Sequence, residues 1–412
     1  MNYLKVSENG HYFEKYGEPF FWLGDTIWPA VAWYSLEEME TYFKIRTEQG
    51  FNVIHIMLPW AMQGWMLAGR LDKEQTADLV SNQIPVFHND NPDTPNEVYF
   101  EKLDKIIAMA NDYDMYMTIL PNGGNGGTHV EGEKILTKEN IRRYGKWLGT
   151  RYKDASNIMW VNGFDIQPWL HVDLVYEFNA GIRESGSDHL LVYHPAGGGS
   201  SSYFHNEPWL DANFIQTWSY YDMIQRLVSF DYYRQPAKPV VMAEGAYEGG
   251  IEYPDGPIDS RLARAQGYWS YLSGGFYTYG HNDIWRKIKW RDAMDAKGAW
   301  QMKILKDFFT ALEWWKLIPD QSVILSRSFA RYTSEGHAMA RADDGSYAVA
   351  YYAHKCTINI NLAKFSDGRP VRSKWMDPQN GQWLEGETYT AATAEIPSPA
   401  QFDDAILLLE TL

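Results

Sequence analysis

The chain has 412 residues, and 45% hydrophobic against 22% charged residues excludes a mainly disordered protein. The chain has 37 Lys and Arg and 53 Asp and Glu, which gives a formal net charge of −16. So acidic a surface repels nucleic acid and anionic lipid. No apolar run reaches the roughly 18 residues of a bilayer span, no signal-peptide pattern opens the chain, and the single Cys356 cannot form an internal disulfide. We therefore expect a cytoplasmic protein without nucleic-acid or membrane partners; these features leave its oligomeric state open.

Strands and helices are predicted to alternate over the first three quarters of the chain. Asn9-Gly10, between two short alternating runs, predicts an N-terminal β-hairpin. Apolar, β-branched or aromatic runs then predict eight strands, at residues 20–26, 52–58, 116–121, 158–165, 190–195, 214–219, 239–245 and 275–280.

Helical periodicity fills most of the intervals between these strands. Ser35 with Glu38 forms a capping box, and Gly50 ends the helix that it begins. Further helices are predicted at residues 98–113, 137–152, 172–185, 259–272 and 297–314. This order predicts an α/β fold, a (β/α)8 TIM barrel over residues 1–318. An open doubly wound sheet is the alternative, but no Gly-rich phosphate-binding turn follows the first strand.

Residues 319–412 have a different pattern. Short strand-like runs at 322–332, 337–342, 346–353, 357–362, 371–377 and 405–410 are separated by turn residues such as Asn380-Gly381. They predict a small C-terminal antiparallel β-sandwich.

Two carboxylates end predicted strands on opposite sides of the barrel. Asp165 follows the fourth strand and Glu244 ends the seventh. The active site of a TIM barrel lies at the carboxyl ends of its strands, and hydrolysis of a glycosidic bond needs one protonated and one ionised carboxyl group. Apolar neighbours favour the neutral form of Asp165. The pair therefore predicts a glycoside hydrolase with Asp165 and Glu244 as catalytic residues.

Other side chains at the predicted strand ends are candidates for binding a sugar, because aromatic rings stack on sugar C–H faces and polar groups bind hydroxyls. For Asp25, capping of its turn is an equal alternative, and the tryptophans could equally be core. The candidate substrate-binding residues are Asp25, Trp28, Trp60, Gln167, His194, Trp218, Tyr247, Tyr279, His281, Asn282 and Trp285.

No motif predicts a cofactor or a metal. The glycines at 123–127 lack the Lys-Ser/Thr of a phosphate-binding loop, and no His or Cys spacing is typical of zinc. Cys356 lies in the predicted sandwich, so cysteine nucleophile chemistry is not expected.

Five ordered motifs resemble the apiosidase-like family, glycoside hydrolase family 140 and its relatives with a DUF4038 barrel. They are WLGDTIW, the strand ending in Asp165, YHPAGGGSSSYFHNEPWLD, KPVVMAEGAYE and YGHNDIW. The tail, with DDGSYAVAYYA and KWMDPQNGQW, resembles the sandwich that is named a putative collagen-binding domain. That name is not carried over as an activity.

The resemblance implies a retaining glycosidase with Asp165 as acid/base and Glu244 as nucleophile. Two departures sit beside these residues, because the family commonly has Gly-Gly-Asp where this chain has Gly163-Phe164-Asp165, and Asp-Gly-Glu where it has Met242-Ala243-Glu244. We expect an exo-acting enzyme that releases a terminal apiose- or arabinofuranose-like sugar. The alternatives are a hexopyranosidase or endo-glycanase on the same barrel, or a non-catalytic carbohydrate-binding protein.

Overall fold

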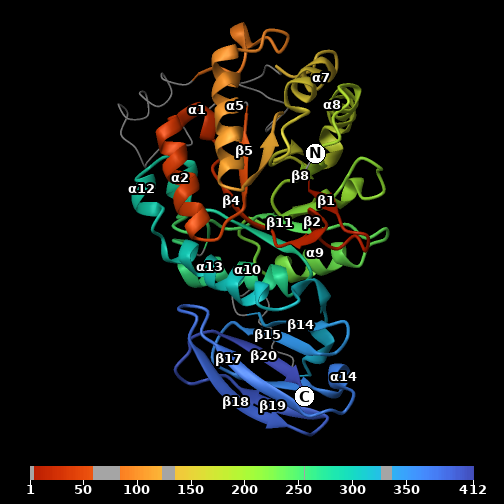
Figure 1. Ribbon diagram of the computed structural model, residues 1–412, viewed down its shortest axis with the longest axis vertical. Helices are drawn as coiled ribbons and strands as arrows, with labels where there is room; N and C mark the ends of the chain where they lie inside the picture. Colours follow the sequence, from red (N-terminus) through yellow and green to blue (C-terminus); the bar gives the residue numbers. More distant parts are fainter. Residues whose placement is uncertain (1–3, 59–83, 123–134, 255, 326–335) are drawn as a thin grey trace.

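The computed structural model describes residues 4–58, 84–122, 135–254, 256–325 and 336–412 (Figure 1). Its main sheet has the strand order β8-β7-β6-β5-β4-β12-β11-β10-β9. Eight parallel strands form a barrel, and they correspond to the eight predicted strands. They are β4 (Leu23–Thr26), β5 (Val53–Met57), β6 (Tyr116–Leu120), β7 (Ile158–Gly163), β8 (Leu191–His194), β10 (Asn213–Gln216), β11 (Val240–Glu244) and β12 (Phe276–Tyr279).

The barrel is nearly closed. Between β8 and β10 the ladder is replaced by a single bridge from Leu191 to Leu210 and by the backbone hydrogen bond from Asp211 to Leu191, 2.9 Å. The short β9 (Gly199–Ser200) pairs antiparallel with β10. The predicted TIM-barrel fold is therefore confirmed, with β9 as an antiparallel addition.

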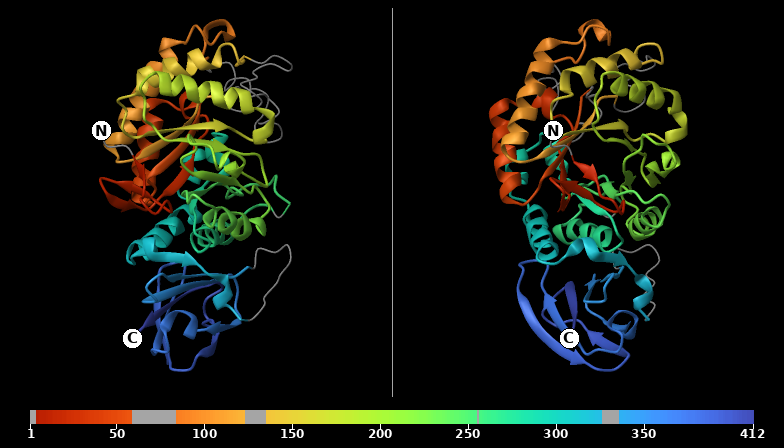
Figure 2. Two further views of the ribbon diagram at one scale, coloured as in Figure 1. Left: turned by 90° about the vertical axis from the view of Figure 1, so that its right-hand side faces the viewer. Right: turned by 45° about the vertical axis from the view of Figure 1, so that its right-hand side comes forward.

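Helices surround the barrel, as Figure 2 shows. The capping box of the first predicted helix is present, since Ser35 Oγ accepts from the Glu38 amide and the Glu38 side chain accepts from the Ser35 amide. α9 was not predicted from the sequence. The longer helices are α2 (Leu36–Glu48), α5 (Glu97–Asp112), α7 (Ile141–Tyr152), α8 (Val172–Glu184), α9 (Met223–Tyr232), α10 (Ser260–Tyr271) and α13 (Lys297–Thr310). The single-turn helices are α1 (Ala30–Trp33), α11 (Asn282–Trp285), α12 (Trp290–Ala293) and α14 (Ala363–Ser366).

An N-terminal sheet precedes the barrel. It consists of β1 (Lys5–Val6), β2 (Phe13–Lys15) and β3 (Glu18–Phe20), all antiparallel. The predicted turn at Asn9-Gly10 joins β1 to β2, and Gly10 has a φ of 78°. This confirms the predicted hairpin.

The C-terminal part, here called the β-domain, has two antiparallel sheets. A six-stranded sheet has the order β13-β14-β15-β20-β17-β18, and β16 pairs with β19. β13, β18 and β19 were not predicted. The predicted strand at 322–332 is wrong at its start, where Gln321–Val323 form a 3-10 helix, and its remainder extends outside the described residues. The strands are β13 (Leu317–Pro319), β14 (Ala338–Ala342), β15 (Tyr347–Tyr352), β16 (Thr357–Asn361), β17 (Val371–Met376), β18 (Trp383–Tyr389), β19 (Thr393–Pro397) and β20 (Ala405–Thr411).

The six-stranded sheet packs against the barrel on one face and against β16 and β19 on the other. In β15, Tyr347, Val349 and Tyr351 belong to the same hydrophobic cluster as the barrel. The intervening Ala348, Ala350 and Tyr352 belong to the separate core of the β-domain. Figure 1 shows α10 and α13 lying over this sheet. Because alternate side chains of a strand point to opposite faces, β15 contributes to two cores at once.

A buried ion pair also joins the two parts. Arg264 of α10 donates to Asp404 through Nε, 2.8 Å, and through a terminal nitrogen, 2.6 Å. Tyr351 donates a third hydrogen bond to the same carboxylate, 2.9 Å. We keep the division between residues 318 and 319 as a prediction. Among the described residues, no helix has the length and apolar character required to span a membrane.

Candidate active site

Asp165, His194 and Glu244 meet at the carboxyl end of the barrel. His194 is the last residue of β8, Glu244 is the last residue of β11, and Asp165 lies two residues beyond β7. One side-chain oxygen or nitrogen from each lies within 4.8 Å of the others. The structure therefore brings together the two carboxylates that the sequence predicted.

The backbone that carries Asp165 is strained. Gly163, Phe164 and Asp165 have φ angles of 78°, 141° and 52°, and positive φ is costly for residues with a Cβ. The turn directs the Phe164 ring toward Trp28, with ring centroids 5.0 Å apart, and toward His194, at 5.5 Å. Phe164 thus adds an apolar ring beside Asp165, at a position where the resemblance led us to expect glycine.

The environment of Asp165 favours a protonated carboxyl group. The side chain reaches solvent, yet the protein around it displaces much of its hydration; this desolvation and, next, the like charge of Glu244 raise the pKa of Asp165 to about 7. His194 and Gln216 oppose the rise, and the Gln216 amide donates to Asp165 Oδ1 at 2.7 Å. At neutral pH, Asp165 can therefore supply a proton.

Several buried polar atoms near the pair have no hydrogen-bond partner among the described residues. His194 Nδ1 lies 3.2 Å from the Pro195 carbonyl, and His194 Nε2 faces Glu244 Oε2 at 3.4 Å, too poorly aligned to satisfy either atom. Gln216 Oε1 is also unsatisfied. Because buried polar groups in proteins are normally paired, these atoms are suited to binding the hydroxyl groups of a ligand.

Aromatic side chains surround Glu244. Tyr247 is buried, and burial followed by the Glu244 charge raises its pKa well above the usual value, so the phenol stays neutral. The half-buried Trp218 packs on Tyr253 with ring centroids 5.2 Å apart. Trp28 is 1% exposed and donates from Nε1 to the Tyr247 hydroxyl, 2.8 Å. Trp28 therefore positions Tyr247 and, contrary to expectation, offers no surface for sugar stacking.

Asp25 is not part of the site. It is fully buried, and its Oδ2 accepts hydrogen bonds from Tyr42, 2.6 Å, and Arg46, 2.5 Å, both in α2. The side chain points out of the barrel toward the helix, because neighbouring residues of a strand face opposite sides. The prediction that Asp25 binds substrate is wrong, and its role is structural.

The candidates at and after the end of β12 are also engaged in structural contacts. Tyr279 is fully buried and donates to Glu248, 2.6 Å. His281 accepts the Asp283 amide as the N-cap of α11. Asn282 is buried and accepts from Trp285 Nε1, 2.8 Å. These contacts hold the side chains in the loop after β12, and the roles of Tyr279, His281, Asn282 and Trp285 in substrate binding stay predictions.

Gln167 and Trp60 are the remaining candidates for substrate binding. Gln167 is half-buried four residues from the positive-φ turn at Gly163, and its role in substrate binding stays a prediction. Trp60 and the glycine-rich segment at 123–127 lie outside the described residues.

Gln216 and Tyr253 were missed by the sequence reasoning. The sixth strand was expected to reach Ser219, but β10 ends at Gln216, so a correct end would have placed Gln216 at the barrel mouth. Tyr253 lies in the long connection between β11 and α10, where no periodic pattern marks it.

Two clusters of possible metal ligands occur among the described residues. One is the Asp165, His194 and Glu244 set, and the other is His337, His354 and Cys356 in the β-domain. The first uses the same carboxylates that would act on a glycosidic bond. The second is remote from it and was not predicted.

Family models match both parts of the chain. The model described as "Apiosidase-like, catalytic domain" matches residues 7–316. The chain belongs to the apiosidase-like family. The model described as "Putative collagen-binding domain of a collagenase" matches residues 318–410. No curated protein matches this sequence.

Solved structures similar to this apiosidase-like protein are glycoside hydrolases. One named a glycoside hydrolase has a TM-score of 0.83 and 24% identity, covering 100% of this chain and 97% of its own. A glycoside hydrolase family 5 protein from Bacteroides vulgatus ATCC 8482 has a TM-score of 0.83 and 25% identity, covering 99% and 93%. A GH27 β-L-arabinopyranosidase from Geobacillus stearothermophilus shares the fold, with a TM-score of 0.59 at 10% identity over 95% and 97%. The apiosidase-like protein is accordingly a glycoside hydrolase that acts on carbohydrate.

Proposed function

We propose that this glycoside hydrolase is a retaining, exo-acting enzyme that removes a small terminal sugar, with Glu244 as nucleophile and Asp165 as acid/base. The observation that carries the proposal is the separation of the two carboxyl groups, whose nearest oxygens lie within 4.8 Å. Retaining enzymes hold the pair about 5–5.5 Å apart, whereas inverting enzymes leave roughly 6.5–9.5 Å for a water molecule. The short distance favours direct attack by one carboxylate.

The proposed reaction has two steps. Glu244 attacks the anomeric carbon while the bond to the leaving oxygen breaks, and the proton of Asp165 passes to that oxygen. Ionised Asp165 then takes a proton from water, whose oxygen attacks the anomeric carbon and releases Glu244. The raised pKa of Asp165, about 7, supports its role as the acid.

A small terminal sugar is favoured by the rings around the pair. Phe164 stands beside His194, and Tyr247 and Tyr253 lie near Glu244. Such crowding suits a pocket for one residue better than an open cleft for a polymer. Membership of the apiosidase-like family supports a pentofuranosyl group such as apiose or arabinofuranose.

A panel of aryl glycosides tests this proposal. Aryl apiofuranosides and arabinofuranosides should be cleaved faster than aryl hexopyranosides or internally linked glycans, and NMR of the first product should show the anomer of the substrate. Faster cleavage of a hexopyranoside or of internal bonds would assign the same site to the alternative substrates. Inversion would refute the double displacement.

Variants of the two carboxylates separate catalysis from binding. Glu244→Gln should abolish turnover with an unchanged circular dichroism spectrum, and Asp165→Asn should lose about 10²–10⁴-fold with poor leaving groups but regain rate with added azide. Glu252→Gln is the matched control, because this exposed carboxylate lies in the connection between β11 and α10 that follows Glu244, and it pairs with Arg286 at 3.2 Å. Saccharide binding by the wild type without any product would favour a carbohydrate-binding protein instead.

A further inference from the structure

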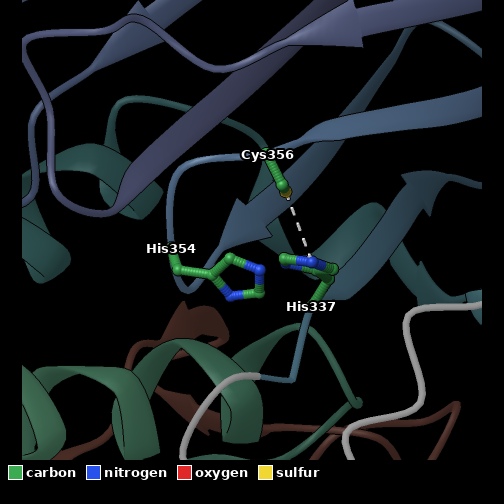
Figure 3. A group of neighbouring side chains, drawn as sticks. All are labelled: His337, His354 and Cys356. Atoms are coloured by element: carbon green, nitrogen blue, oxygen red, sulfur yellow. Dashed lines mark hydrogen bonds between the residues drawn. The ribbon is translucent and has the colours of Figure 1, made fainter.

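Three side chains that can ligate a metal ion meet in the β-domain, whereas the carboxylate pair lies in the barrel. His337 directly precedes β14, while His354 and Cys356 lie in the connection from β15 to β16. Figure 3 shows the three side chains converging, and one ligand atom from each lies within 4.8 Å of the others. His337 is buried, and His354 and Cys356 are half-buried.

The distance between the ligand atoms of Cys356 and His337 matches the distance between two ligands of a tetrahedral metal ion. Cys356 Sγ lies 3.5 Å from His337 Nε2. Zn–S and Zn–N bonds of about 2.3 and 2.0–2.1 Å at a tetrahedral angle place sulfur and nitrogen roughly 3.5–3.6 Å apart. The His354 ring stands 4.9 Å from the His337 ring, so a modest side-chain rotation brings its nitrogen to the same centre.

His354 also has an unsatisfied nitrogen. Its Nδ1 is buried and has no hydrogen-bond partner among the described residues. A buried polar atom without a partner costs free energy that a ligand can recover. In this cluster, a metal ion would supply the missing partner.

We propose that His337, His354 and Cys356 bind a divalent transition-metal ion of the zinc class, with water in the fourth position. Two imidazoles and one thiolate form the donor set that zinc prefers. Mg²⁺ and Ca²⁺ are disfavoured because they require oxygen ligands.

Binding requires the loss of the Cys356 thiol proton and a shift of the His337 ring proton from one nitrogen to the other. Burial raises the pKa of Cys356 to about 11, so the ion must displace the thiol proton. Burial, and then the charge of His354, lowers the pKa of His337 to about 4, so this imidazole is neutral. Coordination through its Nε2 moves the ring proton to Nδ1 and gives up the long 3.4 Å contact from the Ala353 amide.

The proposed site lies where the two sheets of the β-domain meet. β14 and β15 belong to the six-stranded sheet and β16 to the two-stranded sheet, so the ion would connect both sheets. The His337 carbonyl also accepts from Gln225 of the barrel helix α9, 2.9 Å. A bound ion would therefore stabilise the β-domain next to its junction with the barrel.

Cobalt binding to the full chain tests the proposal. The protein is treated with chelator and reductant and titrated with CoCl₂, then with ZnCl₂ as competitor. We expect one Co²⁺ per chain with a sulfur-to-cobalt charge-transfer band that Zn²⁺ removes. Because Cys356 is the single cysteine of the chain, this band reports on this site alone.

Variants test whether the charge-transfer band arises from an ion bound by His337, His354 and Cys356. Cys356→Ser should abolish the band without changing glycosidase activity, and the half-buried His354→Ala should weaken Co²⁺ binding more than about tenfold and remove the rise in Tm caused by Zn²⁺. Glu244→Gln, which alters the other ligand cluster, should leave the band intact. Absence of the band in the wild type, or equal Co²⁺ affinity in wild type and His354→Ala, would overturn the proposal.

Discussion

At the scale of single residues, the proton of Asp165 is controlled by neighbours with opposing effects. Desolvation and Glu244 raise its pKa to about 7, whereas the Gln216 amide favours the ionised form. In the proposed mechanism Asp165 is the acid and must be protonated in the free enzyme, so kcat/KM should fall as pH rises through about 7. Gln216→Leu removes the donor, raises the pKa further, and should move this alkaline limb to higher pH.

The pH profile of kcat/KM on a glycoside with a poor leaving group measures this shift. Thr217→Val is the control, because the neighbouring Thr217 hydroxyl contacts Met242 sulfur at 3.8 Å rather than Asp165. A limb that stays in place in Gln216→Leu would show that the hydrogen bond does not tune Asp165.

Phe164 combines a costly backbone conformation with a ring at the site. At its φ of 141°, a Cβ costs about 1–3 kcal/mol. Phe164→Gly and Phe164→Ala both remove the ring, but only glycine removes the strain. We expect Phe164→Ala to be the less stable variant by that amount in urea denaturation, and equal stability would contradict the strain.

Loss of the ring should also change substrate selection. Both variants should gain kcat/KM for aryl hexopyranosides relative to aryl pentofuranosides, because the space beside His194 widens. If the ratio is unchanged in both, Phe164 does not limit the size of the sugar.

Sequence reasoning brought Asp165 and Glu244 together at the barrel mouth, as the structure places them, because a buried parallel strand that ends in a carboxylate is a strong and local signal. It failed for Asp25, since the direction in which a strand residue points depends on the register of the whole barrel. It did not anticipate that His337, His354 and Cys356 lie together, because His337 and His354 are brought together by the pairing of β14 with β15 and not by a short motif.

At the scale of elements, α7 and α8 approach each other through glycines. A Cβ on Gly181 would lie 2.2 Å from the Arg142 carbonyl oxygen, and one on Gly145 would lie 2.7 Å from the Phe178 carbonyl oxygen. Alanine is the better helix former by about 1 kcal/mol, but here the helices must separate to accept it.

We therefore expect Gly181→Ala to destabilise the protein by about 1–3 kcal/mol, the range for overpacked cores. The urea midpoint measures this change. A gain in stability, as helix propensity alone predicts, would refute the close packing of the two helices.

The predicted strands agree best with the structure where every residue of a strand is buried, because the apolar run in the sequence is then continuous. All five residues of β5 and of β11 are buried, and such apolar runs between helices were recognised. β18 was missed because most of its residues are exposed, so it lacks the alternation that marks a half-buried strand. Its place at the edge of the sheet explains that exposure.

At the scale of the whole molecule, the barrel and β-domain are joined by the Arg264–Asp404 pair, in which neither side chain is more than 2% exposed. Removal of one partner leaves the other charge buried, which typically costs about 3–5 kcal/mol. Asp404→Asn should therefore lower stability by about that amount, whereas Arg264→Met with Asp404→Leu should recover much of it. Urea denaturation of the single and double variants measures the coupling.

Because side chains of β15 and β20 alternate between two cores, the β-domain cannot be exchanged between related enzymes without a change in its packing against the barrel. Ile406 and Leu408 serve the core shared with the barrel, while Leu407 and Leu409 serve the core of the β-domain. If the β-domain were exchanged between relatives, the side chains on one face of β15 and β20 would have to pack against a barrel with a different surface. Successful chimaeras should need α10 and α13 to be exchanged together with the module, because these helices lie over its six-stranded sheet (Figure 1).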